Sequence, residues 1–184
     1  MQLSVSDKII VFFGLIRQYK GLDLLIEAMT DQRLKEQNIK LIVAGEFYDD
    51  EQRYRKLISD FQLQDRIMLH SHFIPDADVK YFICAGDCIV QPYRNATQSG
   101  VTPLAYHFEK PMIVTNVGGL PSLVPHKKAG LVTEPDPHAI ADAIIQFYQL
   151  GEHHFYPFIL EEKKKLSWPN LTSSILQLAN DLNA

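Results

Sequence analysis

The sequence predicts a doubly wound α/β fold, a parallel sheet of about six strands with helices on both faces. Short apolar runs such as IIVFFG and IKLIVAGE recur along the chain, as in strands that are buried on both sides. Longer stretches lie between them, and their apolar residues recur every three or four positions, as in helices. Because this alternation is typical of βαβ units, we expect one Rossmann-like domain over residues 1–184.

Each element can be assigned from its own pattern. The expected strands are residues 9–14, 39–46, 66–74, 87–93, 111–117 and 130–135. The expected helices are residues 20–29, 49–62, 76–86, 99–109 and 136–150. The last of these begins with Asp136 and Pro137, an N-cap residue followed by the residue favoured at the first helical position.

The remaining stretch, residues 151–184, is expected to form C-terminal helices. We place His153 and His154 in a loop between helices. We expect the chain to break at Pro169 and then to resume as a helix whose apolar residues share one face.

Composition limits the classes of function. The chain has 184 residues, of which 46% are hydrophobic and 22% charged, as in an ordinary soluble domain. Its 18 Lys and Arg against 22 Asp and Glu give a net charge of -4, which argues against a nucleic-acid partner. No apolar run approaches the roughly 18 residues of a membrane span, and no signal-peptide pattern is found. We therefore expect a cytoplasmic protein.

A metal site is not expected. Cys84 and Cys88 have no second pair to complete a site, and we interpret them as two buried, reduced cysteines. His70 and His72 share a strand face but have no third ligand nearby in the sequence. No Asp-x-Asp pair lies in a loop that follows a strand.

Ligands of open parallel sheets bind beyond the carboxyl ends of the strands. The dinucleotide fingerprint G-x-G-x-x-G is absent after the first strand, so an NAD-dependent enzyme is not expected. The loop after the fourth strand, NATQSGVT, instead suggests an anion site. If Ser99 caps the following helix, the amides of Gly100, Val101 and Thr102 are unpaired and can bind phosphate. The alternative is a capped helix with a glycine that only packs.

The loop after the first strand, GLIRQYKG, favours the anion site. Arg17 and Lys20 follow the end of a buried strand and could face the same crevice. Arginine binds phosphate oxygens bidentately and lysine acts as a point charge. Two cations and a helix start can neutralise a diphosphate without a metal ion. Taken singly, either residue could also belong to a solvated basic loop.

Nearly the whole chain resembles one family. The segments VFFGLIRQYKGLDLLIEAM, IKLIVAGE, QSGVTPLAYHFEKPMIVTNVGGLPSLV and AGLVTEPDPHAIADAI are similar, in order and spacing, to the C-terminal donor-binding domain of family 4 retaining glycosyltransferases, the glycosyl transferases group 1. These enzymes have the two-domain GT-B fold. The resemblance implies a domain that binds a nucleotide-diphosphate sugar for transfer to an acceptor, with no metal or other cofactor.

The resemblance also implies roles for single residues. Those expected to bind the donor and its diphosphate are Gly14, Arg17, Lys20, Gln98, Ser99, Gly100, Val101 and Thr102, with Arg17 displaced from the family's arginine position. Those expected near the base and ribose are Glu46, Phe73, Ile74 and Tyr93. No certain catalytic residue is expected in this domain. The family's two glutamates around the helix start fall on Ala96 and Leu104, so both carboxylates are missing.

The chain is short for a GT-B enzyme, which needs two such domains. We interpret it as a fragment of a hexosyltransferase-type enzyme, inactive alone, that lacks the N-terminal acceptor-binding domain. The helices of residues 151–184 would pack toward that domain, which would bring a sugar or lipid-linked acceptor, and the longer enzyme could lie at a membrane surface. Two alternatives stay open: a non-catalytic nucleotide-binding or protein-interaction domain of the same fold, and a sugar-nucleotide epimerase.

Overall fold

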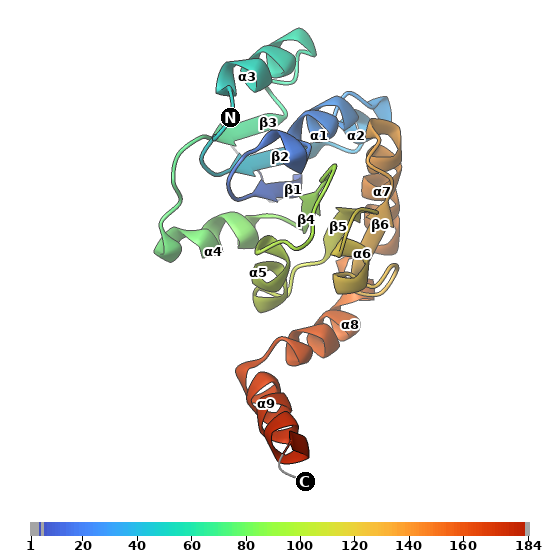
Figure 1. Cartoon of the computed structure of the whole chain (residues 1–184). Coiled ribbons are helices and arrows are strands. Elements are labelled where there is room, and N and C mark those ends of the chain that lie inside the picture. The colour runs from blue at the N-terminus through green and yellow to red at the C-terminus, as the bar shows by residue number, and fades with distance from the viewer. Residues whose placement is uncertain (1–3, 5, 183–184) are drawn as a thin grey trace.

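A computed structural model describes residue 4 and residues 6–182 of the chain. Its centre is one six-stranded sheet with the strand order β3-β2-β1-β4-β5-β6 (Figure 1). All five strand pairings are parallel, as the sequence predicts. The strands are β1 (Lys8–Phe13), β2 (Ile39–Ala44), β3 (Ile67–His70), β4 (Cys88–Gln91), β5 (Met112–Thr115) and β6 (Gly130–Thr133).

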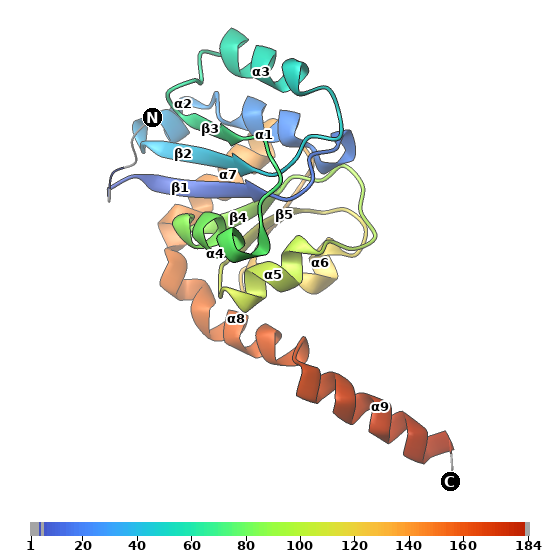
Figure 2. The same ribbon diagram turned by 90° about the vertical axis from the view of Figure 1, so that its left-hand side faces the viewer.

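Helices cover both faces of this sheet (Figures 1 and 2). One side carries α1 (Leu22–Ala28), α2 (Gln32–Glu36), α3 (Glu51–Asp60) and α7 (Pro137–Leu150). The other side carries α4 (Asp76–Ala85), α5 (Val101–His107) and α6 (Leu120–Leu123), with α8 (Glu152–Lys165) packed against α5. A short 3-10 turn, η1 (Gln18–Lys20), lies between β1 and α1. The expected doubly wound architecture is confirmed.

The core lies between these layers. Each of the central strands β1, β2, β4 and β5 buries four or more consecutive residues, which explains the unbroken apolar runs in the sequence. The edge strand β3 is shorter than expected, because the chain leaves the sheet after His70. The fourth strand is also shorter, since it ends at Gln91 before Pro92, which has no amide to donate to a ladder.

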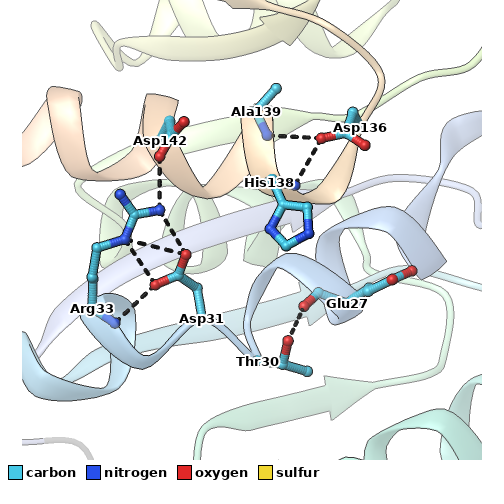
Figure 3. Close-up of polar contacts among 8 residues, drawn as sticks. All are labelled: Glu27, Thr30, Asp31, Arg33, Asp136, His138, Ala139 and Asp142. Carbon is cyan, nitrogen blue, oxygen red and sulfur yellow. Dashed lines mark hydrogen bonds and ion pairs between the residues drawn. The ribbon is translucent and has the colours of Figure 1, made fainter.

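Polar contacts cap the start of α7 and join this helix to α2 (Figure 3). The Asp136 carboxylate accepts hydrogen bonds from the amides of His138 and Ala139, both at 3.0 Å, so the predicted N-cap is confirmed. The Arg33 guanidinium, from α2, lies 2.7 Å from carboxylate oxygens of both Asp31 and Asp142. It thereby ties α2 to α7.

Several local expectations are wrong. His153 and His154 lie inside α8, because Gly151 at a φ of +79° separates α7 from α8 with no loop. Pro169 is the second residue of α9 (Trp168–Leu182), in the first turn, where a missing amide costs nothing. Cys84 is exposed on α4, and only Cys88 is buried. The helices α2 and α6 were not expected, since both are too short for a clear periodicity.

The last helix, α9, has no buried residue and extends away from the body of the protein (Figures 1 and 2). Its exposed apolar side chains include Trp168, Leu171, Ile175, Leu178 and Leu182. Within the described residues, no helix has both the length and the apolar character of a membrane span.

Candidate functional site

The strand order creates a crevice at one edge of the sheet. From β1 the chain continues outward through β2 to β3, then returns to β4 on the other side of β1. The connections that follow β1 and β4 therefore diverge, and a gap opens at the carboxyl ends of these two strands. Such switch points are where open α/β sheets bind their ligands.

The two loops singled out in the sequence meet at this point. The amide of Arg94, after β4, donates to the carbonyl of Tyr19, after β1, at 2.7 Å. Gly21 lies so close to the same loop that a Cβ atom there would be 2.0 Å from the Pro92 carbonyl oxygen. The expectation that both loops occupy one edge of the sheet is confirmed.

Lys20 is the most unusual side chain of the crevice. It is only 9% exposed, yet its ammonium group has no carboxylate or hydrogen-bond acceptor as a partner among the described residues. The ammonium lies 5.6 Å from the centre of the Tyr93 ring and 3.5 Å from the place where a Gly14 Cβ would be. Burial, and then the charge of Arg17, lower the pKa of Lys20. A ligand with negative charge could pair with this ammonium, whose side chain is largely removed from water and has no counter-charge in the described part of the chain.

Arg17 supplies a second positive charge at the edge of the crevice. Its side chain is exposed, and its guanidinium lies 4.9 Å from the centre of the Tyr48 ring. It has no carboxylate partner among the described residues. Arg17 and Lys20 belong to the same loop after β1, and the positive charge of Arg17 contributes to the lowered pKa of Lys20.

The start of α5 differs in detail from the expectation. Gly100 takes the N-cap position, and Ser99 lies one residue earlier. The Ser99 hydroxyl accepts from the Val101 amide at 3.2 Å, and its carbonyl accepts from the Thr102 amide at 3.2 Å. The prediction of three unpaired amides is therefore wrong for Val101 and Thr102. Of the three, only the Gly100 amide has no hydrogen bond to another described residue.

A first hollow, of about 520 Å³, lies beside this helix start. The loops after β4 and β5 line it together with α5, α6 and Leu166, and the two loops touch closely, since a Cβ on Gly119 would be 2.5 Å from the Thr97 carbonyl oxygen. The lining residues are Thr97, Gln98, Ser99, Gly100, Thr102, Pro103, Gly119, Ser122, Leu123 and Leu166. Four of the five residues proposed around the helix start thus line one space, while Val101 faces Gly14.

A second hollow, of about 300 Å³, lies at the ends of β1 and β2. It is lined by Phe13, Gly14, Leu15, Gly45, Glu46, Phe73, Ile74, Asp76, Val79 and Leu104. Three of the four residues expected near the base and ribose, Glu46, Phe73 and Ile74, come together here.

Tyr93, the fourth, is not part of this lining. Its side chain is 2% exposed and lies beneath Lys20, with its hydroxyl 3.2 Å from the Ser99 hydroxyl. Burial raises the pKa of Tyr93 to about 12. The structure therefore gives Tyr93 a supporting position between the two cationic and polar loops.

Six residues that line the second hollow were not among the predicted site residues, namely Phe13, Leu15, Gly45, Asp76, Val79 and Leu104. Asp76 begins α4, and Leu104 belongs to α5. Asp76 follows the predicted third strand closely, so its place at a helix start just beyond a strand end could have indicated it. Elsewhere, the His70 and His72 rings lie 6.3 Å apart, and no group of three or more His, Cys, Asp or Glu residues in the described part of the chain is placed to hold a metal ion.

A sequence profile of the glycosyl transferases group 1 matches residues 7–149, which is most of the chain. The chain belongs to this family. The D-inositol 3-phosphate glycosyltransferase of Corynebacterium glutamicum is 26% identical over 97% of this chain. That match covers 44% of the relative's length, and a match to an uncharacterised glycosyltransferase of Methanocaldococcus jannaschii covers 45%. This glycosyltransferase chain therefore spans less than half the length of these two curated relatives.

Solved structures show the same relation. Sucrose-phosphate synthase from Thermosynechococcus elongatus superposes with a TM-score of 0.80 at 21% identity, over 98% of this chain and 46% of its own. Anabaena HepE, solved in complex with UDP and glucose, superposes with a TM-score of 0.76 at 20% identity, over 97% of this chain and 49% of its own. The C-terminal domain of LpcC, a group 1 glycosyl transferase from Francisella tularensis, gives 0.72 at 21% identity, over 85% of this chain and 83% of that domain. The fold is thus one half of the GT-B architecture.

Proposed function

We propose that this chain is the donor half of a retaining, metal-independent glycosyltransferase and binds a nucleotide-diphosphate sugar at the crevice between β1 and β4. One observation carries the proposal. The Lys20 side chain is largely buried at the switch point of the sheet, and its ammonium has no partner among the described residues.

The surroundings of Lys20 fit a diphosphate. Gly14 presents no side chain beside the ammonium, and Arg17 adds a second charge from the same loop. Sugar transfer builds negative charge on the departing diphosphate, and fixed cations in a site of low dielectric stabilise that charge. Anabaena HepE, whose fold this chain shares, forms a complex with UDP, and this supports a nucleotide as the ligand here.

The reacting sugar would lie at the start of α5. Gln98 and Gly100 line the hollow there, and Gly100 has no side chain to obstruct it. The acceptor would come from the half that this chain does not contain, since the chain spans 44% of its relative. A sugar and a lipid-linked acceptor are both compatible with this arrangement.

Lys20→Ala tests the diphosphate site directly. We expect the affinity for UDP, GDP or ADP, whichever binds most tightly, to fall by about 1–3 kcal/mol, the usual range for a hydrogen bond to a charged group. Isothermal titration calorimetry measures this. Lys80→Ala is a matched control, because Lys80 also lies over a tyrosine ring, at 4.9 Å from Tyr81, but both residues are exposed on α4.

The same titration tests the absence of a metal. Binding should be unchanged in EDTA and should weaken as salt rises, because the contact with the exposed Arg17 is screened. An unchanged affinity in Lys20→Ala, or binding that strictly requires a divalent cation, would contradict the proposal.

A non-catalytic nucleotide-binding domain is the second candidate. Ala96 is buried, and Leu104 lines the second hollow as an apolar side chain, so neither position of the family's glutamates presents a carboxylate. If this alternative holds, the longer protein would bind the nucleotide sugar but release no nucleotide diphosphate from it over time. A coupled assay of nucleotide release separates the two functions.

A further inference from the structure

We infer that Asp23 and Arg94 are positioning residues for the diphosphate site, because they clamp the turn that carries Lys20 to the loop that leads to the start of α5. The inference rests on the proposed function and deepens it, since it names two side chains that act on the ligand only through Lys20. Neither side chain is among the residues that line the two hollows.

The Asp23 carboxylate lies at the centre of this clamp. Asp23 belongs to the first turn of α1, shortly after the 3-10 turn that ends at Lys20. Its side chain is only 13% exposed. It accepts hydrogen bonds from the Arg94 guanidinium at 2.5 Å and 3.1 Å, one to each carboxylate oxygen. Two parallel bonds of this kind fix the orientation of both side chains.

The backbone of Arg94 makes the second half of the clamp. Its amide donates to the Tyr19 carbonyl at 2.7 Å. Its guanidinium also lies 3.5 Å from the Gln18 carbonyl oxygen. The turn that carries Lys20 is therefore bound to the loop after β4 by both the main chain and the side chain of one residue.

The clamp decides what lies beneath Lys20. Tyr93, which directly precedes Arg94, is 2% exposed, and its ring centre lies 5.6 Å from the Lys20 ammonium. The Tyr93 hydroxyl lies 3.2 Å from that of Ser99, close to the start of α5. Because Tyr93 and Arg94 are consecutive, a bond that holds Arg94 to the turn also keeps the ammonium over the ring. The cationic turn and the helix start thus keep one spacing before a ligand arrives, which lowers the cost of binding.

Arg53 offers a matched control within the same cluster. From α3 it donates to the same Asp23 carboxylate at 2.9 Å, and its side chain is 46% exposed against 39% for Arg94. Arg53→Gln therefore removes an ion pair of the same kind from the same acceptor, but leaves the loop after β4 untouched. Ion pairs with exposed partners contribute little to stability, so these variants should fold.

The experiment titrates UDP, GDP and ADP into the chain by calorimetry and follows the one that binds most tightly. We expect Asp23→Asn and Arg94→Gln each to weaken its binding about fivefold, because the turn loses its fixed position. Arg53→Gln should stay within about twofold of the original affinity. The double variant Asp23→Asn/Arg94→Gln should bind about as weakly as each single variant, since both changes remove the same contact.

The signs of the two charges separate positioning from direct electrostatics. Asp23→Asn removes a negative charge near an anionic ligand, so by charge alone it would tighten binding, whereas Arg94→Gln would weaken it. Loss of position weakens binding in both. Weaker binding in Arg94→Gln with unchanged or tighter binding in Asp23→Asn would show that Arg94 acts on the ligand directly, and this would overturn the inference.

The pH dependence of binding gives a readout that a loss of stability alone would not change. A diphosphate pairs with the charged form of Lys20, so the affinity should fall as pH rises through the pKa of Lys20, which burial lowers. When the clamp is broken, the turn becomes more exposed and this pKa rises toward its ordinary value. The fall should therefore move to higher pH in Asp23→Asn and in Arg94→Gln, and keep its place in Arg53→Gln.

The groups that face Lys20 leave this readout clear. Arg17, on the same loop, keeps its charge over the whole range, as arginine does in proteins. Burial raises the pKa of Tyr93, beneath the ammonium, to about 12. Tyr93 therefore titrates above Lys20.

The outcomes separate this inference from the proposed function. Unchanged binding in Asp23→Asn and Arg94→Gln, or an equal loss in Arg53→Gln, would overturn the inference, whereas weaker binding in Lys20→Ala would still support the diphosphate site. A pH profile that keeps its place in both clamp variants would also overturn it. If none of the three nucleotides binds to the original chain, the proposed function and this inference both fail.

Discussion

At the scale of single residues, the candidate site depends on glycines, which have no side chain to keep the loops apart. Gly14, at a φ of +100°, leaves room beside the Lys20 ammonium. Gly45, at a φ of +147°, packs against Gly14, and a Cβ on Gly45 would be 2.1 Å from the Gly14 carbonyl oxygen. Both conformations lie in the region that side chains rarely adopt. The strand-end loops can approach each other only because these positions are glycine.

Gly45→Ala should therefore destabilise the fold. We expect a loss of about 2–4 kcal/mol in the free energy of unfolding, because the added methyl group meets backbone and the backbone is strained. Chemical denaturation followed by circular dichroism measures the change.

Gly100→Ala is the matched control for this loss. Its φ is −64°, and nothing lies within 4 Å of the place where its Cβ would be. The free energy of unfolding should stay within about 0.5 kcal/mol of the original. Equal losses in both variants would refute the account of Gly45.

At the scale of elements, helix starts fix the geometry of the strand-end edge. Asp136 caps α7 through the amides of His138 and Ala139, and α7 packs against α1 (Figure 3). Ser99 acts similarly one residue before the N-cap of α5, through the Val101 amide. These short side chains decide where each helix begins, and so where the lining of the crevice lies.

Asp136→Ala should lower the free energy of unfolding by about 1 kcal/mol, since two helix amides lose their acceptor. Thermal denaturation would show a modest fall in Tm, with nucleotide binding unchanged. Asp65→Ala is the control, because Asp65 is exposed and has no side-chain partner among the described residues. A control that loses as much stability as Asp136→Ala would show that the capping bonds contribute nothing.

At the scale of the whole molecule, the chain spans about half of the architecture to which it belongs. It covers 46% and 49% of two solved enzymes of the same fold. The last helix, α9, exposes its apolar side chains beyond the body of the protein. Catalysis of transfer requires reactants held in place and water excluded, and we expect this to need more than the half of the architecture that the chain spans.

The 184-residue chain alone should therefore bind the nucleotide without transferring a sugar. A coupled assay of nucleotide release, with UDP-glucose and a panel of sugar acceptors, tests this. Calorimetry on the same sample must show that the nucleotide binds, so that inactivity is not mistaken for misfolding. Robust turnover by the chain would show that the half-site interpretation is wrong.

The sequence by itself determined the fold and the edge of the sheet that carries the site. Buried strands leave unbroken apolar runs, and helix starts leave local signals such as Asp136-Pro137, so short stretches suffice to identify both. The order of these elements placed Arg17, Lys20 and the QSG cluster at one edge. Parallel strands bring their carboxyl ends together whatever the details of packing.

Only the tertiary structure decided which groups are paired. Lys20 is buried without a partner among the described residues, and Tyr93 lies beneath it with its hydroxyl near that of Ser99. Ser99 also accepts hydrogen bonds from the amides of Val101 and Thr102. None of these pairings could be read from the sequence. Asp76 likewise joins Glu46 only because β2 and the start of α4 meet at one hollow. Pairing and burial are properties of distances between segments far apart in the chain, and local patterns in a sequence carry no record of those distances.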